Sequence, residues 1–574
     1  MNWISKFTAL WLFLFFFYPP SDIATISPAL TPICVRIDTP PVNRTWGYIP
    51  LLYEDQFHDP IEIQAEIDRM HELAPELIDL ETVGQSYQGR NITSVRITNE
   101  LNTAQKAKTL VVAHHHGREQ ITVETALRFI LRLVNGYGYN QEITHWIDNE
   151  EVYVIPTLNP DALDLVVNNG SHWLRKNLRP FDNDNDTLYD EDPAEDVDGD
   201  GHISEYRVSS KLNSSESYNY LEGIDNDGDG RINEDGVGLV DLNRNYATFW
   251  RYRPGYDTQT YAGTEPFSEP ETQTFRQFAR NHKFAMAYSL HSGINATWFA
   301  RGEEDQYPYL QLYTEMSRDF QTLLPSSFIQ GPVPNLQANE ISASNEAVNQ
   351  ESSNIPTAVG GLWKEWMVFD QGCIAPLTFE IYHNASVDGS GASSVLVDNS
   401  THLITQWKGI FGYFNPEVRF IDDLWRDILP AFDYLLDVTP RLNIDTESDS
   451  AENDQRDRAT FRFSFRNLSP RLGTVDQIAF LGADGRILVK RQPLGAGENR
   501  TEAFGLVLSP DTSGEGYTIS IGNNYTGYTR FVISFSASPA DSSSPAFEFG
   551  ILLAILPWFV FYKKCFSKEE NKSS

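Results

Sequence analysis

Cysteine is scarce in this chain: three cysteines among 574 residues cannot build a disulfide framework, so a packed core has to hold the fold together. Basic side chains are also outnumbered, with 44 Lys and Arg against 79 Asp and Glu and a formal net charge of -35. Because binding to a phosphate backbone needs a basic face, this balance argues against nucleic acid as the main partner. Core-forming residues are plentiful, at 41% hydrophobic and 13% aromatic. The length predicts about two to four domains.

Both ends of the chain carry apolar segments typical of exported and anchored proteins. Lys6 precedes an apolar run at residues 10–18, which indicates an export signal, and residues 549–562 end at two lysines, which fits a cytoplasmic flank. Asn-x-Ser/Thr sequons along the chain fit glycosylation outside the cell. An uncleaved anchor at the start and a buried helix at the end are the alternatives. We predict a cell-surface glycoprotein with a signal peptide at residues 1–25, a linker at 537–546, a transmembrane segment at 547–562 and a cytoplasmic tail at 563–574.

Between these ends, two regions differ in their hydrophobic pattern. Apolar runs that predict strands alternate with helical patterns up to about residue 440, which indicates an α/β domain over residues 46–440. The predicted strands lie at 94–98, 109–113, 152–155, 284–290 and 377–379, and the predicted helical faces at 63–70 and 127–134. Later, short stretches alternate between apolar and polar side chains at 460–465, 517–521 and 530–535. They predict a small all-β sandwich domain over residues 441–536.

Chemically active side chains follow several of the predicted α/β strands, at the sheet edge where sites are built. His116 and Glu119 come after the strand at 109–113 and are three residues apart, so both can face one metal ion. A catalytic Zn²⁺ commonly takes three imidazole or carboxylate ligands and keeps one position for water. His291, at the end of another apolar strand, is the best third candidate. The neighbouring His114 and His115 are expected to pack or to support the ligands.

Peptide hydrolysis also needs a base, a cation for the developing oxyanion and a group that holds the substrate. Glu380 ends the strand at 377–379 and is placed to be the base, while Arg175 is placed to polarise the carbonyl. Arg244, with Asn243 beside it, offers a fork that can capture a free carboxylate and make the reaction exo-acting.

Six short motifs occur in the order found in zinc metallocarboxypeptidases of the carboxypeptidase A type. They are Gly-Gln-Ser-Tyr-Gln-Gly-Arg at 84–90, His-Gly-Arg-Glu at 116–119, Asn-Pro-Asp at 159–161, Asn-Arg-Asn at 243–245, His-Ser at 291–292 and Thr-Phe-Glu at 378–380. The resemblance covers roughly residues 46–415. It implies a mixed eight-stranded sheet with helices on both faces, one zinc held by His116, Glu119 and His291, and Glu380 as general base. It also implies that Arg118 and Arg175 contact the substrate, while Asn243 and Arg244 hold its terminal carboxylate.

The sequence departs from that family at the residue expected to cover bound substrate. Pro356 occupies the place of the family's mobile tyrosine. The stretch that follows leaves the specificity pocket open, because Lys364 favours an acidic terminal side chain and Trp363 a small or flat apolar one.

An acidic insertion at residues 181–236 is the second departure. Its three Asp-x-Asp-x-Asp motifs place oxygen donors at alternating positions, which suits structural Ca²⁺. Position twelve of the second motif is Arg207 rather than glutamate, so these are not helix-loop-helix hands. A solvated flexible loop is the alternative. The predicted calcium ligands are Asp182, Asp184, Asp186, Asp196, Asp198, Asp200, Asp225, Asp227 and Asp229.

The residues together predict an extracellular zinc-dependent carboxypeptidase that removes C-terminal residues from peptides or proteins. One alternative is a zinc amidohydrolase that releases a non-standard amide-linked amino acid or a wall peptide. The other is a catalytically weak adhesion or binding protein.

Overall fold

The computed structural model describes most of the chain between residues 30 and 537. The described ranges are 30–36, 42–102, 106–182, 187–228, 230–233, 235–252, 258–300, 310–330, 360–387, 393–439, 442–446, 452–455, 458–467, 479–482, 487–490, 499–507, 517–523 and 527–537. The predicted signal peptide, transmembrane segment and cytoplasmic tail therefore lie outside the described residues. No helix in the described part of the chain is both long enough and apolar enough to cross a bilayer.

An eight-stranded mixed sheet forms the centre of the α/β domain, as predicted. Its strands run in the spatial order β10-β9-β11-β8-β4-β5-β3-β2. Their bounds are β2 (Ile78–Gln85), β3 (Asn91–Ile97), β4 (Ala107–Val112), β5 (Glu150–Ile155), β8 (Met286–His291), β9 (Ile294–Phe299), β10 (Ile329–Gln330) and β11 (Ala375–Tyr382). The four neighbours β11, β8, β4 and β5 are mutually parallel, whereas β3 and β9 pair antiparallel with that group. The carboxyl ends of the four parallel strands therefore share one edge of the sheet.

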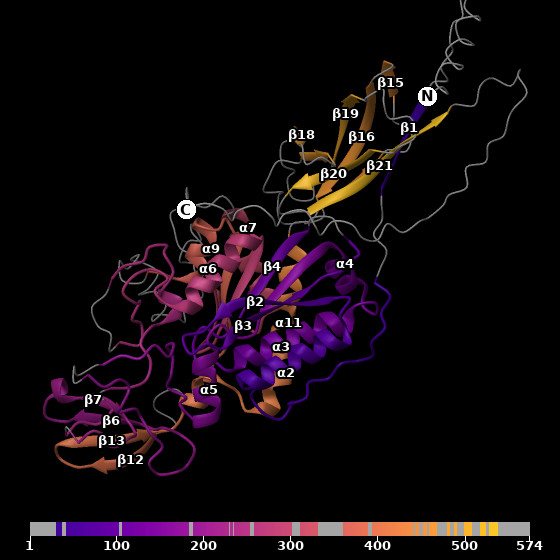
Figure 1. Cartoon of the computed structure of the whole chain (residues 1–574). Coiled ribbons are helices and arrows are strands. Elements are labelled where there is room, and N and C mark those ends of the chain that lie inside the picture. The colour runs from indigo at the N-terminus through magenta and orange to yellow at the C-terminus, as the bar shows by residue number, and fades with distance from the viewer. Residues whose placement is uncertain are drawn as a thin grey trace, which may run out of the picture. The chain divides into compact units, whose positions relative to one another are not determined.

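Helices cover both faces of this sheet (Figure 1). Successive side chains of a strand point to opposite faces, and β4 follows this rule: Val111 packs into the core beneath α2, α3 and α11, while Leu110 and Val112 pack into the core beneath α6 and α9. The helices are α2 (Pro60–Leu73), α3 (Ile121–Gly136), α4 (Gln141–Asn149), α5 (Pro160–Asn169), α6 (Pro270–His282), α7 (Leu310–Leu323), α9 (Trp363–Phe369), α10 (Ile410–Phe414) and α11 (Ile421–Val438).

The local sequence explains where helix α2 begins and which face it buries. Asp59 caps the helix by accepting hydrogen bonds from the backbone N–H groups of Ile61 and Glu62, and Pro60 stands at the first helical position. Ile63, Ile67 and Met70 recur at helical spacing and are all buried, as their periodicity predicts.

The acidic insertion contributes two strands to a second sheet that the sequence did not predict. This four-stranded sheet has the order β12-β13-β6-β7 (Figure 1). Strands β6 (Glu205–Ser210) and β7 (Tyr218–Leu221) belong to the insertion, whereas β12 (Ser393–Asp398) and β13 (His402–Trp407) come from a hairpin almost 200 residues later. The insertion is thus joined to the domain by antiparallel pairing of β6 with β13.

Beyond residue 441 every described element is a strand, in agreement with the predicted all-β region. The strands are β14 (Leu442–Thr446), β15 (Glu452–Gln455), β16 (Arg458–Asn467), β17 (Ala479–Gly482), β18 (Ile487–Lys490), β19 (Asn499–Val507), β20 (Tyr517–Asn523) and β21 (Gly527–Ala537). They form one sheet of β14, β16, β15 and β19 and another of order β1-β21-β20-β17-β18, in which β1 is Leu30–Arg36. By compactness the chain divides into residues 34–534 and a unit of residues 1–33 with 535–574. The predicted boundary at residue 441 stays a prediction.

Candidate active site

Two parallel strands and the turn before a helix bring the three predicted zinc ligands together. His291 is the last residue of β8, and His116 and Glu119 lie between the end of the adjacent β4 and the start of α3. The Nδ1 atom of His116 lies 2.7 Å from Glu119 Oε1, and the Nδ1 atom of His291 lies 2.9 Å from Glu119 Oε2. The two Nδ1 atoms are 3.2 Å apart. The ligand atoms of all three residues thus face one another.

This donor set fits a zinc ion. The ligand atoms lie within 4.8 Å of one another, and each side chain is at least 97% buried. Two imidazole nitrogens and a carboxylate are a common catalytic zinc set, in which the fourth position remains for water. Burial alone would raise the pKa of Glu119, but the charges and hydrogen bonds of His116 and His291 hold it well below its usual range. Glu119 is therefore ionised, as a ligand to a cation has to be.

Asp241 supports this cluster and was not among the site residues predicted from the sequence. Its fully buried carboxylate accepts hydrogen bonds from His116 Nε2 at 3.1 Å, from Arg175 Nε at 2.9 Å and from the backbone N–H of Asn243 at 2.9 Å. Burial opposes ionisation, but the positive charges of Arg175 and Arg244 and the contact with His116 hold the pKa of Asp241 well below its usual range. A carboxylate behind a ligating imidazole fixes its tautomer and ring orientation. The only signal in the sequence was an acid two residues before Asn243.

Glu380 lies on the strand next to His291. Strand β11 pairs parallel with β8, and Glu380 stands opposite His291 in that register. Its side chain is partly buried. Burial and the negative charge of Glu119 raise the pKa of Glu380 well above its usual range, against the lowering effects of Arg175, Lys364 and Arg244. A carboxyl group with a raised pKa beside a metal site has the properties of a general base.

Two arginines predicted to contact substrate lie close to the ligand cluster. Arg175 approaches Glu119 with an Nη1–Oε1 distance of 3.7 Å while its Nε–H binds Asp241. Arg118 stacks on the ring of Phe414, with its guanidinium carbon 4.3 Å from the ring centroid. Burial and the nearby charge of Arg175 lower the pKa of Arg118 to about 10. Among the described residues its buried Nε–H has no hydrogen-bond partner.

Asn243 and Arg244 lie in a short 3-10 helix, η2 (Leu242–Arg244), that Asp241 caps. The Oδ1 atom of Asn243 accepts a hydrogen bond from the backbone N–H of Trp363 at 3.0 Å, and its Nδ2 atom lies 3.2 Å from His291 Nε2. Arg244 Nη1 donates to the backbone oxygen of Asn243 at 2.9 Å. The predicted carboxylate-binding pair is therefore held directly beside the ligand cluster.

The two residues considered for the specificity pocket differ in their exposure. Trp363 is fully buried and packs edge-on against His115 at 6.4 Å between ring centroids. Lys364 is partly exposed, and its positive charge acts on the carboxyl group of Glu380. Of the two, only Lys364 presents accessible side-chain surface. Pro356 lies outside the described residues.

Two of the acidic motifs fold into loops with the same hydrogen-bond pattern. Asp196 accepts hydrogen bonds from the N–H groups of Gly199 and Gly201, three and five residues later. Asp225 does the same with Gly228 and Gly230. These four glycines have positive φ, a backbone conformation that favours glycine.

A further carboxylate and a lysine side chain lie next to the second motif. Lys408 forms ion pairs with Asp198 and Asp200. Asp196, Asp198 and the buried Glu222 form a group of clustered carboxylates, of which Glu222 was not a predicted calcium ligand. Of the remaining predicted calcium ligands, Asp182 and Asp227 are described, and Asp184, Asp186 and Asp229 lie outside the described residues.

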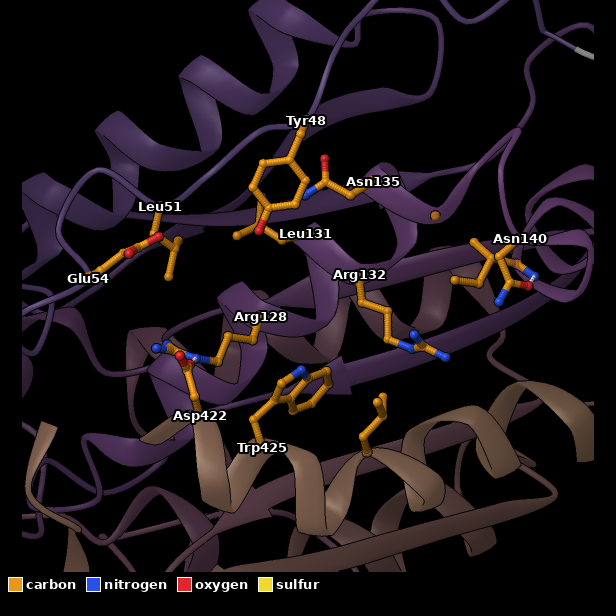
Figure 2. Close-up of a pocket in the computed structure, with 13 residues that line it drawn as sticks. Tyr48, Leu51, Glu54, Arg128, Leu131, Arg132, Asn135, Asn140, Asp422 and Trp425 are labelled. Atoms are coloured by element: carbon orange, nitrogen blue, oxygen red, sulfur yellow. Dashed lines mark hydrogen bonds and ion pairs between the residues drawn. The ribbon is translucent and has the colours of Figure 1, made fainter. Parts of the chain in front are cut away.

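A separate surface pocket of about 450 Å³ lies between α3, α11 and the segment that precedes α2 (Figure 2). Its lining includes Arg128, Arg132 and Trp425 but none of the predicted zinc-binding or catalytic residues. Both arginines are paired with acids of α11, Arg128 with Asp422 and Arg132 with Asp433. The pocket is therefore distinct from the candidate active site.

Comparison with known proteins shows which family this chain resembles. A family model described as zinc carboxypeptidase matches residues 63–427. A zinc carboxypeptidase of Saccharothrix mutabilis subsp. capreolus is 33% identical over 140 residues, which are 24% of this chain and 31% of that protein. The inactive metallocarboxypeptidase ECM14 of Saccharomyces cerevisiae is 29% identical over 125 residues, 21% of this chain and 29% of that protein. The chain thus spans less than a third of the length of these relatives.

Among solved structures, carboxypeptidase A from Helicoverpa armigera is similar at 17% identity, with a TM-score of 0.44 and coverage of 67% of this chain and 74% of that one. Murein-tripeptide amidase MpaA from Escherichia coli O157 is similar at 16% identity, with a TM-score of 0.24 and coverage of 52% and 82%.

Proposed function

This chain belongs to the zinc carboxypeptidase family, and we propose that it is an active, extracellular zinc carboxypeptidase that releases C-terminal residues from peptides or proteins. The observation that carries the proposal is the convergence of His116, Glu119 and His291 on one point, with Glu380 opposite His291 on the neighbouring strand. Some relatives are named as inactive, so the presence of the complete set of ligands and base matters for this chain.

The proposed roles follow from charge and position. Zinc held by His116, Glu119 and His291 would act as a Lewis acid and lower the pKa of a bound water to about 7. Glu380 would take the proton of the attacking water and pass it to the nitrogen of the departing residue. Arg175 would donate to the carbonyl oxygen of the scissile bond as negative charge develops on it.

The same arrangement would make the reaction specific for free C termini. Arg244 and Asn243 would bind the terminal carboxylate, because a guanidinium fork matches the two oxygens of a carboxylate. Arg118, whose guanidinium stacks on Phe414, would hold a carbonyl oxygen of the substrate.

A matched pair of peptides tests this function. The purified protein with zinc should release the last residue of a peptide with a free C terminus and leave the same peptide unchanged when that terminus is amidated. Equal cleavage of both peptides would contradict the role of Arg244 and Asn243 and would favour an endo-acting hydrolase.

The same assays would distinguish two other functions. If free and blocked peptides are both left intact while a side-chain-linked amino acid or a wall peptide is cleaved, the protein is an amidohydrolase that uses the same zinc site. If it binds zinc and cleaves none of these substrates, it is an adhesion or binding protein.

We also propose that calcium orders the insertion. The matching backbone turns at Asp196 and Asp225 and the carboxylate group of Asp196, Asp198 and Glu222 support this idea. Lys408 forms ion pairs with Asp198 of this group and with Asp200, so it competes with a cation for these two carboxylates. Calcium added to zinc-saturated protein should raise the melting temperature, and an unchanged melting temperature across the titration would exclude the proposal.

The proposed location is the cell surface, with the protein exported and anchored by residues 547–562. Its support is the pattern of the two apolar ends in the sequence. Fractionation of producing cells tests it: recovery of the full-length chain in the soluble cell interior would contradict it.

A further inference from the structure

The zinc ligand His291 uses one ring nitrogen for the cluster, so its other nitrogen needs a partner. Its Nδ1 atom faces Glu119 and His116, and its Nε2 atom lies 3.0 Å from Ser289 Oγ and 3.2 Å from Asn243 Nδ2. A neutral imidazole that binds a metal through Nδ1 carries its proton on Nε2. Because the His291 side chain is buried, that N–H requires a hydrogen-bond acceptor within the protein.

Ser289 is the acceptor, because the Asn243 amide is already oriented. The Oδ1 atom of Asn243 accepts the backbone N–H of Trp363 at 3.0 Å, which leaves the NH₂ group facing His291. An NH₂ group cannot accept a hydrogen bond from an N–H. The hydroxyl oxygen of Ser289 can accept the N–H of His291, so the hydroxyl hydrogen of Ser289 is left to donate to another group.

The hydroxyl hydrogen of Ser289 points to His115, and the series of hydrogen bonds continues from His115 to Tyr246. Ser289 Oγ lies 3.2 Å from His115 Nδ1, and His115 Nε2 lies 3.1 Å from the hydroxyl oxygen of Tyr246. A neutral imidazole has one donor and one acceptor nitrogen, so a His115 ring that accepts from Ser289 at Nδ1 donates to Tyr246 from Nε2. The direction is then fixed: His291 donates to Ser289, Ser289 donates to His115, and His115 donates to Tyr246.

The three residues that follow His291 in this series of hydrogen bonds are all buried, which restricts their movement. Ser289, His115 and Tyr246 are all 0% exposed. The Tyr246 ring packs against Phe267, Phe275 and Trp366, which hold its hydroxyl group in place. Because none of these three side chains is exposed, they are positioning residues.

We propose that Ser289, His115 and Tyr246 form a positioning chain that holds the ring of His291 in the orientation that binds zinc. The inference rests on the proposed function, since it requires that zinc occupies the site. The two histidine ligands would then be held differently, His116 by the carboxylate of Asp241 and His291 by a neutral hydroxyl. A neutral partner for His291 adds no further negative charge beside Glu119 and Glu380.

Two substitutions each remove one hydroxyl group from the positioning chain. Two matched substitutions elsewhere in the core control for a loss of stability. Ser289→Ala deletes the acceptor for His291, and Tyr246→Phe deletes the oxygen at the far end. Ser94→Ala changes a fully buried serine of β3, and Tyr288→Phe removes a buried hydroxyl that donates to the backbone oxygen of Ala431 at 3.0 Å. Neither control residue contacts the zinc ligands.

The readouts are the dissociation constant for Zn²⁺, measured by competition with a chelator of known affinity, and the visible spectrum of the cobalt-substituted protein. Loss of a group that orients a ligand typically weakens metal binding by about 10- to 100-fold. We expect Ser289→Ala to raise the dissociation constant by at least about 10-fold and Tyr246→Phe by a smaller factor of about 3-fold or more, both with an altered cobalt spectrum. Ser94→Ala and Tyr288→Phe should leave both readouts as in the unchanged protein.

The outcomes separate this inference from the proposed function. If the unchanged protein binds no zinc, both fall. If it binds zinc and Tyr246→Phe, folded by circular dichroism, has the same dissociation constant and cobalt spectrum as Tyr288→Phe, the positioning chain is refuted and the zinc site stands. Tyr246→Phe decides the question alone if Ser289→Ala does not fold.

Discussion

Replacing Asp241 with asparagine should weaken zinc binding and destabilise the domain at the same time. The substitution keeps the size of the side chain and one oxygen atom but removes the negative charge. That charge faces His116 Nε2, Arg175 Nε and, at 3.9 Å, Arg244 Nη1. Both arginines would then remain in a buried site without their shared counter-ion.

The magnitude follows from these contacts. Breaking a buried ion pair by removing one partner costs about 3–5 kcal/mol, and the lower end applies here because the amide oxygen of asparagine still accepts one hydrogen bond. Loss of the carboxylate behind His116 should weaken zinc binding by about 10- to 100-fold, equivalent to about 1.4–2.7 kcal/mol.

Asp161→Asn is the matched control for this experiment. Asp161 is also fully buried and accepts hydrogen bonds from Ser86 Oγ, Gln88 N and Arg90 Nη1 at 2.7–2.8 Å, but it does not contact the zinc ligands. Denaturant unfolding should show a comparable loss for both variants, whereas chelator competition should show weaker zinc binding for Asp241→Asn alone. Equal zinc affinities in the two variants would refute the role assigned to Asp241.

Two further predictions concern substrate binding and pH. Arg244→Ala should raise KM for peptides with a free C terminus by about 10- to 100-fold, the value of a hydrogen bond to a charged group, with a smaller effect on kcat; steady-state kinetics that show an unchanged KM would contradict this. Burial alone would lower the pKa of His58, but hydrogen bonds to Glu124 and Glu66 outweigh it and raise the pKa to about 9. Because this folded-state pKa lies above the unfolded value of 6.5, the stabilisation is complete below that value and is lost as pH rises through about 9, a loss of about 3 kcal/mol. The free energy of unfolding should therefore fall by about 3 kcal/mol more in the unchanged protein than in His58→Gln between about pH 6 and about pH 9.5, and equal falls would disprove it.

The parts of the fold that could be predicted from sequence are those set by local pattern. The apolar run predicted at 109–113 overlaps strand β4 at Ala107–Val112, and the run predicted at 284–290 overlaps β8 at Met286–His291. Each is a continuous apolar stretch, as expected for a strand covered by helices on both faces. Because parallel strands place their carboxyl ends at one edge, the meeting of His116, His291 and Glu380 could be expected before the register was known.

The features of the fold and the site that could not be predicted from the sequence depend on contacts between segments that are distant along the chain. Asp241 is one acid among 79, and only its contacts with His116 and Arg175 distinguish it. The chain from His291 to Tyr246 joins residues separated by 174 and 131 positions, so no local pattern marks it. For the same reason no strand is predicted in the insertion, although β6 pairs with β13 almost 200 residues later.

The most direct test of the central claim is a joint measurement of zinc content and peptide hydrolysis in the unchanged protein and in Glu380→Gln. The account predicts one zinc per chain in both, release of C-terminal residues by the unchanged protein, and a loss of hydrolysis of at least about 100-fold in Glu380→Gln. Absence of zinc from the unchanged protein, or undiminished hydrolysis by the variant, would contradict it.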